Sequence, residues 1–161
     1  MGRIPVFYSF HYANDVMRVQ QIRNIGALEG NEPVSANDWE QVRRGGDTSI
    51  KRWIDENMKY KRCLIVLVGA ETSERPWVKY EIEKAWNDGK AIFGIYINNL
   101  RCPRNGTSAK GKNPFDEFSF QDGRKLSSVI NCYDPGGYDT YNQIARNIGA
   151  WVNTAIEQRR T

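Results

Sequence analysis

The stretch "CLIVLVG" (63–69) decides the fold class, because it is apolar at every position before its final glycine. A strand with one wet face would alternate apolar and polar residues, so this run indicates a strand buried on both faces. The following stretch, "SERPWVKYEIEKAW" (73–86), repeats apolar residues at helical spacing. We predict a helix over 74–88, ended by Asp88 and Gly89. A buried strand followed by an amphipathic helix is typical of a parallel sheet covered by helices.

The same alternation extends in both directions along the chain. Upstream, the patterns predict a strand at 5–10, a helix at 15–25 capped by Asn14 or Asp15, a short strand within 27–35 and a helix at 47–58. Downstream, they predict strands at 91–97 and 127–133, a polar loop at 101–118, and a helix at 138–156. In that last helix one face is expected to be core: Tyr141, Ile144, Ala145, Ile148, Val152 and Ala155. We therefore expect a single domain over residues 1–161, a three-layer, flavodoxin-like α/β fold with a five-stranded parallel sheet and helices on both faces.

Composition excludes several classes of protein. The net charge of +4 comes from Lys and Arg residues scattered along the chain, whereas a nucleic-acid binder gathers them on one element, so we expect no nucleic-acid partner. No apolar run is long enough to span a membrane, and "MGRIPVFYSF" (1–10) lacks the long apolar region of a signal peptide. Three cysteines without a CxxC pair favour a reduced setting. We expect a soluble, cytoplasmic protein without a membrane partner.

The strand ends exclude further functions, because ligands of open parallel sheets bind beyond the carboxyl ends of the strands. The first strand runs into "YSFHYAND" (8–15), which has no glycine-rich phosphate loop and no acidic cluster of a phosphoacceptor domain. His11 is the only histidine, so a Ser-His-Asp hydrolase and a metal site are both unexpected. We predict no metal and no resident cofactor. The polar and aromatic groups that remain at these ends are Ser9, Phe10, His11, Asn14, Asn37, Asp38, Trp39, Glu71, Thr72, Ser73, Trp77 and Glu81.

Glu81 stands out in the helix 74–88 because it borders the face that must be buried. Val78, Ile82 and Ala85 form the apolar stripe, and Glu81 lies beside it, one turn after Trp77. A carboxylate there is partly desolvated, and the helix N-terminus and Lys84 are expected to influence its pKa. The alternative is an ordinary surface ion pair, which is common on helices.

Taken together, these motifs resemble the TIR domain family, most closely the TIR-like proteins of the bacterial Thoeris anti-phage system. "PVFYSFHYAND" (5–15) is similar to the family's first-strand motif, and "SERPWVKYEI" (73–82) to its Ser-x-x-x-Trp-x-x-x-Glu motif through Ser73, Trp77 and Glu81. "NDWEQVRRGGDTSIKRWID" (37–55) resembles the loop after the second strand and the helix behind it. The resemblance extends from Val6 to about Ile156.

The resemblance implies chemistry on NAD+. Glu81 matches the family's catalytic glutamate, which assists cleavage of the nicotinamide–ribose bond, and Thoeris relatives cyclise the ADP-ribose into a signalling nucleotide that activates a separate effector. NAD+ is then the substrate and no cofactor is needed. The candidate substrate-binding residues are Ser9, Phe10, His11, Asn14, Asp38, Trp39 and Trp77. The resemblance also implies self-association through TIR surfaces.

Two departures from the family pattern stand out, and two other functions stay open. Val78 replaces the usual cysteine after the tryptophan, and His11 stands where many TIR enzymes carry an arginine. Phosphate contacts therefore need another cation, for which Arg43 and Arg44 are candidates. The alternatives to an NAD+-cleaving enzyme are a non-catalytic scaffold that acts by TIR–TIR association and a sensor that binds the nucleotide without turnover.

Overall fold

The computed structural model describes residues 3–30, 42–104 and 106–160 and contains an all-parallel sheet covered by helices. The sheet order is β2-β1-β3-β4-β5, the order of a flavodoxin-like fold, as predicted. The strands are β1 (Pro5–Ser9), β2 (Glu29–Gly30), β3 (Cys63–Val68), β4 (Ala91–Tyr96) and β5 (Cys132–Tyr133). The helices are α1 (Tyr12–Arg23), α3 (Gly46–Met58), α4 (Pro76–Asn87) and α5 (Thr140–Arg160), with short 3-10 turns η1 (Thr72–Glu74), η2 (Pro114–Glu117) and η3 (Leu126–Ser128).

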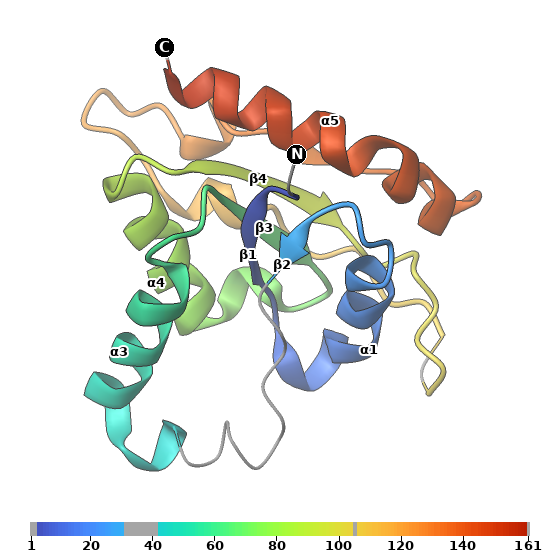
Figure 1. The fold of residues 1–161 in the computed structure, drawn as a ribbon, viewed down its shortest axis with the longest axis horizontal. Helices are drawn as coiled ribbons and strands as arrows, with labels where there is room; N and C mark the ends of the chain where they lie inside the picture. Colours follow the sequence, from blue (N-terminus) through green and yellow to red (C-terminus); the bar gives the residue numbers. More distant parts are fainter. Residues whose placement is uncertain (1–2, 31–41, 105, 161) are drawn as a thin grey trace.

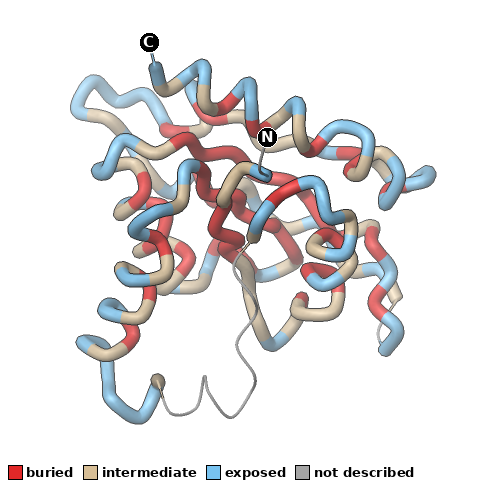
Figure 2. Tube along the Cα trace, in the orientation of Figure 1, coloured by how far each residue is buried: buried red, intermediate tan, exposed pale blue. Residues whose placement is uncertain are grey.

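The sheet separates two hydrophobic cores, so the fold has three layers (Figure 1). Helices α1 and α5 cover one face, and α3 and α4 cover the other. Every residue of β3 and β4 is buried, which places these strands at the centre of the molecule (Figure 2). The apolar run at 63–69 is therefore what it was predicted to be, a strand packed on both faces.

The beginning of α1 differs from the prediction. The helix starts at Tyr12, and its N-cap is His11, whose side chain makes no capping hydrogen bond. Neither Asn14 nor Asp15 caps the helix. Asp15 is instead buried and pairs with Arg18 one turn later, at 2.7 Å between Oδ1 and Nη1. Asp15 has the local propensity of a helix cap, but it forms a buried ion pair instead. That pair is buried only because the rest of the fold surrounds it.

The C-terminal third contains three further differences. Strand β5 has only two residues within the predicted 127–133, because η3 occupies Leu126–Ser128. Helix α5 runs four residues beyond the predicted end at 156, to Arg160. Tyr141 and Ala145, predicted as core, are 40% exposed and half-buried respectively, because the buried stripe of α5 begins at Thr140 and continues through Ile144 and Ile148. In the described ranges neither α5 nor any other helix is long and apolar enough to cross a membrane.

The predicted loop 101–118 is anchored to the carboxyl end of the sheet. Gly111 lies so close to β3 that a Cβ on it would come within 2.0 Å of the Gly69 carbonyl oxygen. Lys110 extends over the Tyr96 ring, with Nζ 4.4 Å from the ring centre, and pairs with Asp134 at 2.8 Å. Phe115 is completely buried in the core under α4. The loop therefore covers the ends of β3 and β4, while β1 continues into α1 beside it.

Two glycines, one in β4 and one in α5, differ in the space around them, which predicts opposite effects of alanine substitution on stability. A Cβ at Gly94 would lie 2.8 Å from Cys132 Sγ and 3.0 Å from the Phe115 ring, whereas one at Gly149 in α5 meets nothing within 4 Å. We expect Gly94→Ala to lower the free energy of unfolding by about 1–3 kcal/mol through overpacking. Gly149→Ala should raise it by about 0.5–1 kcal/mol through helix propensity. Urea denaturation measures both, and a neutral Gly94→Ala would contradict this packing.

Candidate functional site

Ser9 and Glu81 meet at the carboxyl end of β1. Successive side chains of a strand point to opposite faces, so Ser9 shares its face with Phe7, which packs in the core beneath α3 and α4. Glu81 faces inward from the middle of α4, beside Val78 and Ile82. The Ser9 hydroxyl donates a hydrogen bond of 2.7 Å to Glu81 Oε1. The exposed fraction is 1% for Ser9 and 7% for Glu81, so this is a buried polar contact and not a surface pair.

Burial decides the protonation of Glu81. Removing the carboxyl group from water raises its pKa from the ordinary 4.5 to about 8, and the hydrogen bond from Ser9 only partly offsets that rise. Lys84, expected to influence this pKa, forms its ion pair with Asp88 instead, at 3.2 Å. Glu81 is therefore mostly a neutral acid at pH 7, and a positive charge brought next to it would favour its ionised form.

The turn between β3 and α4 holds Glu81 in place. Thr72 Oγ1 accepts a 2.8 Å hydrogen bond from the Gly69 amide, which closes the chain into η1. Pro76 occupies the first position of α4, where a missing N–H has no cost and the fixed φ favours a helix. Arg75 is the N-cap residue, and its buried Nε has no hydrogen-bond partner among the described residues. The turn thus leaves one guanidinium unpaired at the beginning of the helix that carries Glu81.

His11 and Asn14 lie across from this turn, on the start of α1. The Asn14 amide donates a 2.8 Å hydrogen bond to Glu71 Oε2, and His11 Nδ1 lies 3.8 Å from the same oxygen. Burial and then the charge of Arg75 lower the pKa of His11, so the ring is neutral near pH 7 and the 3.8 Å approach is a contact between a ring and a carboxylate. Glu71 itself is exposed. The ends of β1 and β3 therefore share a rim of hydrogen-bonding groups.

The two predicted aromatic residues pack against opposite faces of the sheet, Trp77 on the α3/α4 side that holds Glu81 and Phe10 on the α1/α5 side. Phe10 is half-buried and stacks on Tyr12, with ring centres 6.1 Å apart. Trp77 is also half-buried and packs edge-on against Tyr80 at 5.8 Å. The Tyr80 hydroxyl donates a 2.8 Å hydrogen bond to Asp55 of α3, which fixes the aromatic pair. Both predicted aromatic residues therefore offer part of their surface.

A buried network behind the rim holds the neighbouring segments together. Asp15 lies against Gly69, where a Cβ would come within 2.1 Å of its Oδ2. Arg18 pairs with Asp15 and donates hydrogen bonds to two carbonyl oxygens of the segment after β4, at 2.9 Å to Leu100 and 2.8 Å to Gly106. Breaking a buried pair of this kind is costly, so the network fixes α1, the end of β3 and the loop relative to one another.

The structure brings four of the predicted site residues into two sets of contacts. Ser9 contacts Glu81, and His11 and Asn14 both approach the Glu71 carboxylate. Asp38 and Trp39 lie outside the described residues. The sequence places Glu71 among the polar groups after the third strand, but it does not single out Arg75, because a charged residue in a turn is usually solvated.

The described ranges contain no group of three or more His, Cys, Asp or Glu side chains that could hold a metal ion. The polar groups of the site are instead hydroxyl, carboxyl, amide and guanidinium groups. Such a set suits an organic substrate with hydroxyl groups and an anionic portion.

The raised pKa of Glu81 predicts a pH-dependent stability. Between the unfolded pKa of 4.5 and the folded pKa of about 8, the folded state holds one proton more than the unfolded state. Stability from this group is therefore complete below about pH 4.5 and falls as pH rises to about 8, by up to about 1.4 kcal/mol per pH unit. Glu81→Gln should remove this loss of stability. The free energy of unfolding of the variant, relative to that of the wild type, should therefore increase from pH 5 to pH 8 in urea denaturation. A difference that stays constant would mean that Glu81 titrates normally.

Comparison with known proteins identifies the family of this chain. A sequence model of the family described as "Thoeris protein ThsB, TIR-like domain" matches residues 7–101, more than half of the chain, including Ser9, Trp77 and Glu81. The chain is also 32% identical, over 148 residues, to a Bacillus cereus (strain MSX-D12) protein named "Putative cyclic ADP-D-ribose synthase ThsB1". The alignment covers 87% of this chain and 76% of that protein. The chain belongs to the TIR-like family of Thoeris ThsB proteins.

Proposed function

We propose that this protein cleaves NAD+ between nicotinamide and ribose and joins the resulting ADP-ribose into a ring. The observation that carries the proposal is the buried hydrogen bond between Ser9 and Glu81, at the carboxyl end of a parallel sheet. A buried carboxyl group with a strongly shifted pKa at the place where such sheets bind ligands is typical of a catalytic residue. The name of the Bacillus cereus relative supports the same reaction.

The proposed reaction begins with heterolysis of the C1–N bond of the nicotinamide ribose. The electron pair leaves with nicotinamide, which becomes neutral, and the ribose retains an oxocarbenium-like positive charge. Because the leaving group departs as a neutral molecule, no general acid is required. In this proposal the Glu81 carboxylate stabilises that charge or accepts a hydrogen bond from a ribose hydroxyl.

The substrate itself would prepare Glu81 for this role. Free Glu81 is mostly protonated at pH 7 because of its burial. The nicotinamide ring of NAD+ is positively charged, and an opposite charge within a few Å lowers the pKa of a carboxyl group. Binding would then release the proton, and the Ser9 hydroxyl would hold the carboxylate that forms. Catalytic charge would appear only when substrate is present.

The second step decides the product. A ring nitrogen of adenine attacks the ribose carbon in cyclisation, whereas water attacks and loses a proton in hydrolysis. We assign cyclisation and a cyclic ADP-ribose product, in agreement with the name of the relative. Exclusion of water favours this outcome, and the anchored loop 101–118 covers part of the strand ends where water would enter. The signalling product would act on a separate effector.

Arg75 is our candidate for the phosphate contact that His11 does not supply. Its Nε is buried without a hydrogen-bond partner in the described ranges, and its charge acts on His11 across the rim. A pyrophosphate group is a suitable partner for an unpaired guanidinium. Arg43 and Arg44, the candidates from the sequence, are exposed.

The first test replaces the carboxyl group of Glu81 without changing its shape. We expect Glu81→Gln to reduce nicotinamide release from NAD+ by at least about 100-fold, with folding intact, because the charge needed in the transition state is lost. Glu83→Gln, on the exposed side of the same helix, is the matched control and should retain wild-type activity. Liquid chromatography with mass spectrometry identifies nicotinamide and the partner product, with protein alone and in lysate of phage-infected cells.

The same experiment separates the other functions. No nicotinamide release by folded wild-type protein under any condition would favour a scaffold or a sensor that works through TIR–TIR association. Linear ADP-ribose as the sole product would make the protein a hydrolase. Equal loss of activity in Glu81→Gln and Glu83→Gln would contradict the role given to the buried carboxyl group.

Arg75→Gln tests the phosphate contact. We expect the KM for NAD+ to rise by about 10-fold or more with kcat little changed, since a hydrogen bond to a charged group contributes about 1.5–3 kcal/mol. Cleavage of nicotinamide riboside, which has no phosphate, should be unaffected by the substitution. Steady-state assays on both substrates measure the two effects. A larger KM effect in Arg43→Gln or Arg44→Gln would move the contact to those residues.

A further inference from the structure

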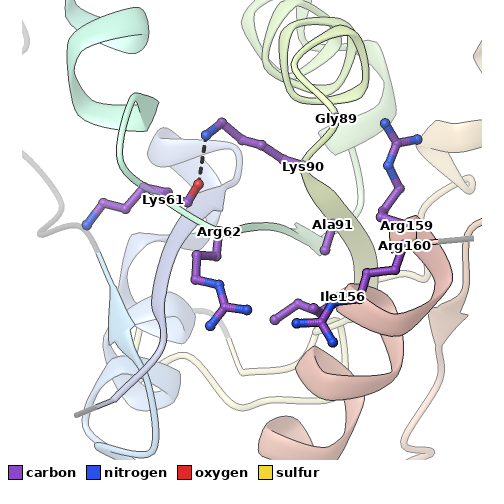
Figure 3. Close-up of a pocket in the computed structure, with 8 residues that line it drawn as sticks. All are labelled: Lys61, Arg62, Gly89, Lys90, Ala91, Ile156, Arg159 and Arg160. Atoms are coloured by element: carbon purple, nitrogen blue, oxygen red, sulfur yellow. Dashed lines mark hydrogen bonds between the residues drawn. The ribbon is translucent and has the colours of Figure 1, made fainter.

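A second polar site lies at the opposite end of the sheet, at the amino ends of β3 and β4. It is a pocket with a volume of about 270 Å³. Its lining comes from three separate segments: Lys61, Arg62, Gly89, Lys90, Ala91, Ile156, Arg159 and Arg160 (Figure 3). Five of these eight residues carry a positive charge and none carries a negative charge. Glu81 and Ser9 lie at the carboxyl ends, so the two sites are distinct.

Two of the five cations have structural roles within the pocket wall. Lys90 Nζ donates to the carbonyl oxygens of Lys59 and Lys61, at 3.3 and 2.7 Å, beyond the end of α3. Arg159 donates to the Trp86 carbonyl at 2.9 Å and stacks over the Trp86 ring at 3.9 Å. These partners are carbonyl groups and an indole ring, none of which carries a full negative charge. Both side chains therefore remain sources of positive potential.

The remaining cations supply the donors. In Figure 3 the guanidinium groups of Arg62 and Arg160 reach toward the same space from opposite sides, while Lys61 points away. No described residue pairs with the Arg62 side chain. Arg160 pairs with Glu157 at 3.2 Å, but both side chains are mostly exposed, and an exposed pair of this kind is weak. Two planar donor groups are thus available to one ligand.

The end of a helix does not explain this concentration of charge. Arg159 and Arg160 lie in the last turn of α5, where basic residues commonly offset the partial negative charge of the helix end. Lys61, Arg62 and Lys90 come from the segments before β3 and β4, and no helix end accounts for all three. Burial lowers the pKa of Lys90, an effect that the charge of Asp88 partly offsets, and burial also lowers the pKa of Arg159.

We propose that this pocket binds a pyrophosphate group of a small molecule between Arg62 and Arg160. A ligand with several negative charges fits a pocket lined by five cations and no acid, and arginine forks bind phosphate oxygens in pairs. The volume lies just below the usual range of about 300–1,000 Å³ for small-molecule sites, which suits a compact anion better than a whole dinucleotide. Ala91 and Ile156 give the pocket an apolar floor. The proposal does not depend on the reaction proposed for Glu81.

The test uses full-length protein and inorganic pyrophosphate as the probe. Titration followed by amide NMR should shift Gly89 and Ala91 of the pocket and leave Ser9 and Ala70, at the other end of the sheet, unchanged. The double variant Arg62→Gln/Arg160→Gln should weaken pyrophosphate binding at least tenfold, measured by calorimetry. Arg52→Gln, an exposed arginine of α3, has the same chemical change outside the pocket and should alter affinity by less than twofold.

Further probes separate the sources of the phosphate group. ADP binding more tightly than pyrophosphate would identify a nucleotide diphosphate as the ligand, and equal affinities would identify the pyrophosphate group alone. Either result supports the proposal, provided that AMP binds more weakly. Shifts confined to Ser9 and Ala70, or equal binding by the double variant, would overturn it. So would a hexaglutamate peptide that binds the pocket more tightly than pyrophosphate, because the surface would then suit an acidic protein segment.

Discussion

The hydrogen bond between Ser9 and Glu81 is the interaction on which the site depends. It requires a strand that ends with a hydroxyl on the face of α4, and a helix that turns a carboxyl group inward among apolar side chains. Neither side chain can supply its own hydrogen-bond partner, and a buried polar group without a partner costs free energy of folding. The register between β1 and β3 positions Ser9, and the turn at Thr72 and Pro76 positions α4, so that the two side chains meet. Structure and proposed chemistry therefore share one contact.

The parallel sheet gives the molecule two chemically different ends. At the carboxyl ends, Glu81 is buried among apolar side chains with the Ser9 hydroxyl as its partner, and the Arg75 charge acts on His11. At the amino ends, cations from three segments line one pocket, and no acidic residue is among the residues that line it. All strands point the same way, so every strand contributes to both ends, and loops at one end change without disturbing the other.

Much of this could be predicted from the sequence, for physical reasons. The apolar run at 63–69 and the spacing in α4 report burial directly, so sheet, layers and Glu81 followed from them. What failed depends on long-range contacts: Asp15 has the local chemistry of a helix cap, yet it pairs with Arg18, which also donates a hydrogen bond to the Leu100 carbonyl beyond β4. Arg75 and the basic pocket were out of reach for the same reason, because an unpaired charge is visible only once its neighbours are placed.

In our proposal Glu81 is a buried acid whose carboxyl group becomes ionised when the substrate binds. The measurement is the titration of the Glu81 side-chain carboxyl group by ¹³C NMR, with the signal assigned through Glu81→Gln. Repeating it with a carba-NAD+ analogue that resists cleavage shows whether the bound substrate changes the ionisation of Glu81. We expect a midpoint near 8 in the free protein, and a lower midpoint once the positively charged nicotinamide is bound. A midpoint near the ordinary 4.5 that does not move with the analogue would contradict it.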